Sequence, residues 1–144
     1  ADALIKMGIV SDTSEAFLKY LEYGGKYIPV KKITTKRCME FLTKHHFFIS
    51  LAHPFQYKFS DSQLESLLSH LINSGLNGIE VYHSTHSDDD KKKLNLLAKK
   101  YNLFPTGGSD FHGAHKPGLN IGTGYGDLKV PYTILEDILA QNKY

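Results

Sequence analysis

Side chains that bind metals gather at three points of the chain, each directly after a short apolar run. They are His53, then His83 and His86, then Asp110 and His112. If the apolar runs are parallel strands, their carboxyl ends meet at one edge of a sheet, where such folds place their chemistry. Imidazole nitrogens together with carboxylate oxygens suit divalent transition metals such as zinc, manganese and iron. The pattern therefore predicts a mixed nitrogen and oxygen site at that edge.

Each candidate also has a simpler interpretation. His53 precedes Pro54, and a single histidine there is typical of a structural turn. Asp110 and His112 are two positions apart, so in an extended segment they point the same way and could bind one ion or two neighbouring ions. The preceding Gly107-Gly108 pair can let the backbone approach a ligand closely. That glycine pair strengthens an otherwise weak Asp-x-His pattern.

The second strand end is open to two interpretations. Glu80 is either an exposed strand residue or a carboxylate that orients a ligand histidine, because a buried unpaired acid is costly. His83 and His86 either bind at the site or only flank the start of the next helix. Asp88 to Asp90 are better explained as the first turn of that helix, where acids match the helix dipole, than as ligands.

The elements that must position these residues alternate between helices and short strands. We expect helices over 35–45, 60–72 and 87–101, and a last one from Thr133 with Ile134, Leu135, Ile138 and Leu139 inward. Strands are expected over 47–52, 78–82 and 103–106. This order predicts an α/β fold with a parallel sheet. Before it, helices are expected at 3–7 and 14–23, the second ended by Gly24-Gly25, with an extended link over 27–30.

Composition excludes several classes of protein. The 144 residues carry 17 basic and 15 acidic side chains, a net charge of +2, with the lysines scattered, so charge predicts no duplex-binding protein. No apolar run approaches the about 18 residues of a membrane span. Cys38 is the single cysteine, which allows no intrachain disulfide and favours a reducing, cytoplasmic compartment; we expect it to be a core thiol.

Three segments together resemble the PHP (polymerase and histidinol phosphatase) family of metal-dependent phosphoesterases. They are Leu51-Ala52-His53-Pro54, Gly75-Leu76-Asn77-Gly78-Ile79-Glu80-Val81-Tyr82 and Gly107-Gly108-Ser109-Asp110-Phe111-His112-Gly113. The stretch before them, with Glu15 to Leu21 and Tyr27-Ile28-Pro29, looks like the helical insertion of the branch that acts on nucleoside 3',5'-bisphosphates and short RNA. The resemblance covers nearly all of the chain.

The resemblance implies a distorted α/β barrel of about seven strands that holds two or three divalent metal ions. It places residues 1–30 in the helical insertion and 31–144 in the C-terminal part of the barrel. His53, Asp110 and His112 fall on metal-ligand positions of the family. Glu80 and His86 match recurrent positions of the second strand end, where they would orient a ligand or contact substrate. The backbone amides of Gly107 and Gly108, with His86 and Lys116, are candidates for contact with phosphate. The implied function is hydrolysis of a phosphate ester, in a small molecule or a short nucleic acid, by metal-activated water.

The sequence departs from the family pattern in one respect, which affects the expected metal site. Members begin with a strand that carries His-x-His, and this chain has no such motif. The start inside a helical pattern leads us to expect the C-terminal part of a longer enzyme, inactive by itself because only part of the metal site is present. The alternatives are a non-catalytic nucleic-acid-binding or regulatory module, in which Phe55, Tyr57 and Phe59 would stack on bases, and an amidohydrolase barrel.

Overall fold

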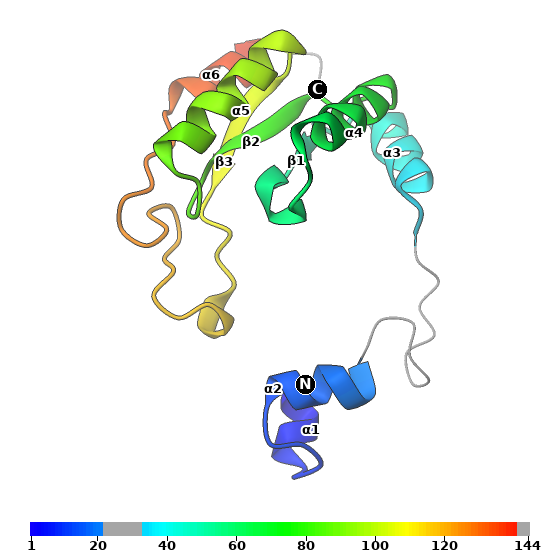
Figure 1. The fold of residues 1–144 in the computed structure, drawn as a ribbon, viewed down its shortest axis with the longest axis vertical. Coiled ribbons are helices and arrows are strands. Elements are labelled where there is room, and N and C mark those ends of the chain that lie inside the picture. Colours follow the sequence, from blue (N-terminus) through cyan, green and yellow to red (C-terminus); the bar gives the residue numbers. More distant parts are fainter. Residues whose placement is uncertain (22–32, 141–144) are drawn as a thin grey trace. The chain divides into compact units, whose positions relative to one another are not determined.

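The computed structural model describes residues 1–21 and 33–140, and the chain divides into two compact units, 1–34 and 35–144 (Figure 1). The first unit contains α1 (Asp2–Lys6) and α2 (Thr13–Ala16), which continues as a π-helical turn, η1 (Phe17–Leu21). Asp12 caps α2 by accepting the backbone N–H of Glu15 at 2.8 Å. The predicted Gly24-Gly25 stop and the link over 27–30 lie outside the described residues.

The second unit is built on a parallel three-stranded sheet in the order β1, β2, β3. The strands are β1 (Ser50–Leu51), β2 (Gly78–His83) and β3 (Phe104–Gly108). α3 (Thr35–Lys44) precedes β1, whereas α4 (Asp61–Asn73) and α5 (Asp88–Lys100) form the two crossovers, and α6 (Thr133–Ala140) follows β3. The α/β prediction is confirmed. β1 is shorter than predicted, and in residues 33–140 the sheet is open rather than a closed barrel.

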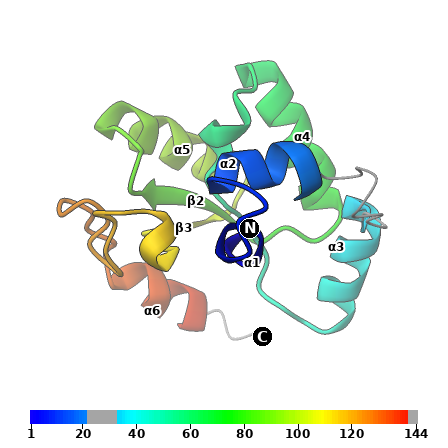
Figure 2. The ribbon, with the colours of Figure 1, turned by 90° about the horizontal axis from the view of Figure 1, so that it is seen from below.

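Helices cover both sides of this sheet. Figure 2 shows α4 and α5 on one side of the strands and α6 on the other. Ile79 and Val81 of β2 are fully buried against Leu68 of α4 and Leu94 of α5, and these four side chains form the centre of the core. Both crossover helices begin with capping boxes, Ser60 with Gln63 and Ser87 with Asp90. The sequence predicts the box at Ser60, whereas at Ser87 it predicts an N-cap followed by acids in the first turn. The core therefore holds β2 in position, and the capping boxes set the residues at which the helices after β1 and β2 begin.

Asn77 joins the amino ends of the strands. Its side-chain Oδ1 accepts the backbone N–H of Ile49 at 2.8 Å, and its own N–H donates to the Ile49 carbonyl at 2.8 Å. Its carbonyl accepts the N–H of Phe104 at 2.9 Å. One residue therefore connects all three strands before the sheet proper begins.

Two hydroxyls meet across the central strand. Ser50 of β1 and Thr106 of β3 lie 2.7 Å apart, although β2 runs between their strands. Gly78 makes room for this contact, because a Cβ there would lie 3.1 Å from Thr106 Cγ2 and 3.0 Å from the Phe104 carbonyl oxygen. A larger residue at position 78 would therefore force its neighbours to move by a few tenths of an ångström.

Two predictions of burial are wrong. Leu135 and Leu139 of α6 are 46% and 59% exposed rather than inward, and the helix buries no residue fully. Cys38 is exposed on α3 rather than in the core. In both helices an amphipathic pattern identified the element but not the side that a neighbour would cover. None of the described helices is long and apolar enough to cross a membrane.

Candidate metal centre

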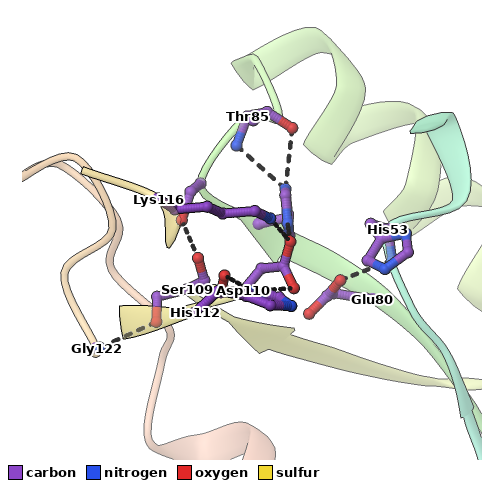
Figure 3. A network of polar contacts seen from close by, with 10 residues as sticks. His53, Glu80, Thr85, Ser109, Asp110, His112, Lys116 and Gly122 are labelled. Carbon is purple, nitrogen blue, oxygen red and sulfur yellow. Dashed lines mark hydrogen bonds and ion pairs between the residues drawn. The ribbon is translucent and has the colours of Figure 1, made fainter. Parts of the chain in front are cut away.

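The sheet brings the predicted site residues to one edge. β1 ends before His53, β2 carries the half-buried Glu80 in its middle and ends at His83, and β3 ends at Gly108 before Asp110 and His112. Figure 3 shows Glu80 directed at His53 and Asp110 lying among His112, Lys116 and the end of β2. The three segments therefore converge as the sequence predicts.

Two of the predicted ligands have left-handed backbone, which is costly for residues with a side chain. His53 has φ 32° and ψ 59°, and Asp110 has φ 55°. Such conformations cost on the order of 1–3 kcal/mol each and cluster at functional sites. The surroundings hold them: the Glu80 carboxylate accepts the His53 N–H at 2.7 Å, and the Ser84 hydroxyl donates to the Ser109 carbonyl at 2.8 Å. Glu80 thus orients the backbone of a candidate ligand rather than its ring.

His83, whose role the sequence left open between the site and the start of the next helix, connects the candidates. Its side chain is 2% exposed, its ring centroid lies 5.9 Å from that of His53, and its Nε2 lies 3.5 Å from Asp110 Oδ2. The Thr85 N–H donates to His83 Nδ1 at 3.2 Å, so the neutral ring carries its proton on Nε2. Burial lowers the pKa of His83 and favours this neutral form. His83 therefore offers a hydrogen-bond donor beside Asp110.

A signal for His83 was present in the sequence. Ile79, Val81 and His83 alternate along β2, and the first two point into the core. Because a strand repeats every two residues, His83 continues the buried face rather than flanking the next helix.

His112 and His86 have the opposite tautomer. Nδ1 of His112 lies 2.6 Å from the Asp110 carbonyl oxygen, and Nδ1 of His86 lies 2.9 Å from the Val81 carbonyl oxygen. A carbonyl only accepts, so each Nδ1 carries the proton and each Nε2 keeps a lone pair, the usual arrangement of a metal-binding histidine. His112 is half exposed, whereas His86 is buried with its ring against Phe55.

Asp110 is held between cations and donors. Lys116 forms an ion pair with its Oδ2, and His112 Nδ1 lies 3.5 Å from its Oδ1. The hydrogen bond from Lys116 lowers the pKa of Asp110, so the side chain is a carboxylate at neutral pH. A carboxylate that remains charged at neutral pH is a suitable oxygen ligand for a divalent metal ion.

The two glycines before Asp110 have different roles. A Cβ on Gly107 would lie 2.6 Å from Tyr82 Cβ and 2.8 Å from the Tyr82 carbonyl oxygen, so this position packs against β2. A Cβ on Gly108 would lie 3.3 Å from Glu80 Oε1. Within the described residues, the close approach predicted for this pair is made to β2 and to Glu80.

The donor set fits a divalent transition metal in kind but is incomplete. His53 Nδ1 and His86 Nε2 are buried without a hydrogen-bond partner among the described residues, and buried polar atoms without partners are uncommon in folded proteins. His83 Nε2 is also without a partner there, but because it carries the ring proton it can donate a hydrogen bond and cannot bind a metal ion. Over 1–21 and 33–140, however, no three His, Cys, Asp or Glu side chains are grouped closely enough to hold one ion. The residues present therefore fit part of a metal centre.

Comparison with known proteins gives relatives over most of the chain, although no model of a protein family matches it. A 3',5'-nucleoside bisphosphate phosphatase of Chromobacterium violaceum is 30% identical over 120 residues, 83% of this chain and 42% of the relative. The 5'-3' exoribonuclease Rnm of Escherichia coli is 29% identical over 110 residues, 76% of this chain and 38% of the relative. The chain thus spans less than half the length of these curated relatives.

Solved structures share the fold. A protein of Bifidobacterium adolescentis described as a metal-dependent phosphoesterase matches with a TM-score of 0.63 and 27% identity, over 97% of this chain and 48% of that one. A Chromobacterium violaceum protein described as an amidohydrolase, solved with sulfate and without metal, matches with a TM-score of 0.65 and 27% identity, over 96% and 48%.

Proposed function

We propose, from the premise that the chain belongs to the PHP family of phosphoesterases, that it provides the later strands and part of the metal site of an enzyme that hydrolyses phosphate esters with a metal-activated water. The substrate we propose is a nucleoside bisphosphate or the end of a short oligonucleotide. Two relatives of the chain, the bisphosphate phosphatase and the exoribonuclease described above, are named for such substrates. Residues 1–30 are proposed to be the helical insertion of that enzyme, and residues 31–144 the C-terminal part of its barrel.

The observation that supports this function most directly is the unsatisfied edge of the sheet. Buried imidazole nitrogens without partners and a carboxylate in left-handed backbone lie at the carboxyl ends of three neighbouring strands. Polar groups left unsatisfied in a fold cost stability, so their presence together favours a bound ion or substrate.

We assign metal binding to His53, Asp110 and His112. Bound divalent ions would make hydroxide available near neutral pH and would neutralise phosphoryl oxygens. Glu80 keeps His53 in place through its backbone N–H, and the Asp110 carbonyl keeps the His112 ring in the tautomer with a free Nε2. His83 presents Nε2–H toward Asp110 and can donate to an oxygen held there.

A non-catalytic binding module is the second candidate, and the aromatic side chains after His53 bear on it. Phe55 packs on His86 at 5.6 Å between ring centroids and is part of the fold, which removes it from this argument. Tyr57 and Phe59 are 43% and 44% exposed and stack on each other at 5.7 Å. They could stack on bases in either candidate, so turnover separates the two.

The test uses the full-length protein with Mn²⁺ and two substrates, a nucleoside 3',5'-bisphosphate and a 5'-phosphorylated trinucleotide. We expect release of inorganic phosphate or mononucleotide, and we expect Asp110→Asn to lower kcat by about a thousandfold or more because the metal loses a charged ligand. The isolated 144-residue chain should be inactive.

The matched control is Asp127→Asn, which changes an exposed carboxylate after the same strand. It should leave kcat unchanged, and circular dichroism should show both variants folded. Absence of turnover with any divalent metal would favour the binding module, and near-normal turnover by Asp110→Asn would remove Asp110 from the metal site.

A further inference from the structure

Lys116 occupies the position beside Asp110 that a bound cation would take. Its ammonium group is ion-paired with Asp110 Oδ2, and its side chain is 37% exposed. The other carboxylate oxygen faces His112. In this arrangement the charge of Asp110 is balanced by a lysine of the same chain.

A metal ion on Asp110 conflicts with that ion pair. An ammonium group and a divalent cation that share one carboxylate oxygen lie within a few Å of each other, where repulsion between their charges is strong. A metal ion that binds through Oδ2 must therefore displace Lys116. Where the ammonium group can go is decided by the space around it.

A cavity of about 280 Å³ adjoins Lys116. Its wall is formed by Gln56, His83, Ser84, Thr85, Ser109, Asp110, Lys116, Pro117, Leu119 and Tyr125. Apart from Asp110, its polar lining consists of neutral groups and this one lysine. His83, which is 2% exposed, has an Nε2 without a hydrogen-bond partner among the described residues. The volume is at the lower end for ligand pockets and suits a phosphoryl group with part of a sugar.

We propose that the cavity beside Asp110 binds a phosphoryl group of the substrate and that Lys116 moves from Asp110 to this group when a metal ion takes its place. The inference rests on the proposed function. Lys116 supplies the positive charge and His83 Nε2–H a second donor, both of which are suited to a phosphate oxygen. The same lysine thus competes with the metal ion and assists the substrate.

This double role predicts two effects of opposite sign for Lys116→Met, which removes the charge and keeps the length of the side chain. Mn²⁺ should bind more tightly, by threefold or more, because its competitor on Asp110 is gone. Inorganic phosphate should bind the Mn²⁺-loaded protein more weakly, by tenfold or more, because the cavity has lost its cation. A merely structural lysine would not move the two affinities in opposite directions.

The experiment is titration calorimetry of the full-length protein, first with Mn²⁺ and then with inorganic phosphate on the loaded form. Lys129→Met is the matched control, since Lys129 is exposed and is absent from the cavity wall; both affinities should stay at the wild-type values. Circular dichroism verifies that each variant is folded.

Unchanged or weaker Mn²⁺ binding by Lys116→Met would overturn the competition with the metal. Unchanged phosphate binding would overturn the phosphoryl site. Both readouts are binding constants and need no turnover, so a protein that hydrolyses nothing would refute the proposed function while these two results still decide the role of Lys116.

Discussion

Asn77 and His83 lie at opposite ends of β2, and their surroundings differ. Asn77 uses its side chain and both backbone groups to connect β1, β2 and β3. His83 is almost completely buried, yet its Nε2 has no hydrogen-bond partner among the described residues and lies 3.5 Å from Asp110. One end of the strand therefore satisfies its polar groups within the fold, and the other end leaves them available.

This difference indicates that the residues that stabilise the sheet and the residues that are available for binding lie at opposite ends of its strands. Satisfied polar groups contribute about 1 kcal/mol each, whereas unsatisfied buried ones cost about 1–3 kcal/mol. Substitutions at the amino ends should therefore lower the free energy of unfolding and leave the site's properties intact. Substitutions of the unsatisfied polar side chains at the carboxyl ends should change binding more than stability.

The largest effect on stability is expected at the end of β3, where the strand stops packing against β2 and begins to face the site. Gly107→Ala should lower the free energy of unfolding by about 3 kcal/mol, because its Cβ would overlap the Tyr82 backbone. Gly108→Ala should cost less than about 1 kcal/mol, since its Cβ meets only the end of the Glu80 side chain at 3.3 Å. Urea denaturation of both variants measures the difference. Equal losses of stability in the two variants would show that Gly107 and Gly108 do not differ in how tightly they pack against the fold.

A smaller loss is expected at the amino ends. Asn77→Ala should lower the free energy of unfolding by about 2 kcal/mol, because the part-buried N–H of Ile49 loses its acceptor. Urea denaturation measures this loss, and calorimetry should find Mn²⁺ affinity in the full-length protein unchanged. A large drop in Mn²⁺ affinity would contradict the separation between the two ends.

The smallest effect concerns pH. Burial lowers the pKa of His83 from its ordinary value of 6.5, so below pH 6.5 the unfolded chain binds a proton that the folded chain resists. The contribution of His83 to stability is complete above pH 6.5 and is lost as the pH falls toward the lowered pKa. Its slope stays below about 1.4 kcal/mol per pH unit, the limit for one proton.

Urea denaturation of the metal-free protein at pH 7.5 and 5.5 measures this slope. His83→Gln should flatten it, whereas His70→Gln, which changes an exposed histidine on α4, should leave it as in the wild type. An identical slope in wild type and His83→Gln would show that His83 is not kept neutral by the fold.

Local signals explain how much of the fold could be predicted from the sequence. The capping boxes at Ser60 and Ser87 mark the starts of α4 and α5, because a cap depends only on residues within the first turn. β1 is shorter than its apolar run, since pairing with β2 includes only Ser50 and Leu51. The exposed side of α6 could not be predicted, because it depends on which residues from elsewhere pack there.

The sequence predicted at which edge of the sheet the site lies, but not which side chains contact one another there. His53, Asp110 and His112 could be selected because they follow apolar runs, and Glu80 because it is an acid inside one. The tautomer of His83 depends on the Thr85 N–H, and the partner of Asp110 is Lys116, six residues further along. Both are loop contacts, and no periodic pattern predicts them.

The hydroxyl contact between Ser50 and Thr106 has a geometric consequence. In a flat sheet, residues on strands once removed are roughly 10 Å apart, too far for two short side chains to touch. Their 2.7 Å separation across Gly78 means that the three strands form an arc, with both hydroxyls on its inner side. Glu80, which carries its carboxylate on the same strand face as Gly78, lies on the inside of that bend. Further strands added at the same curvature would wrap around the polar residues rather than extend away from them.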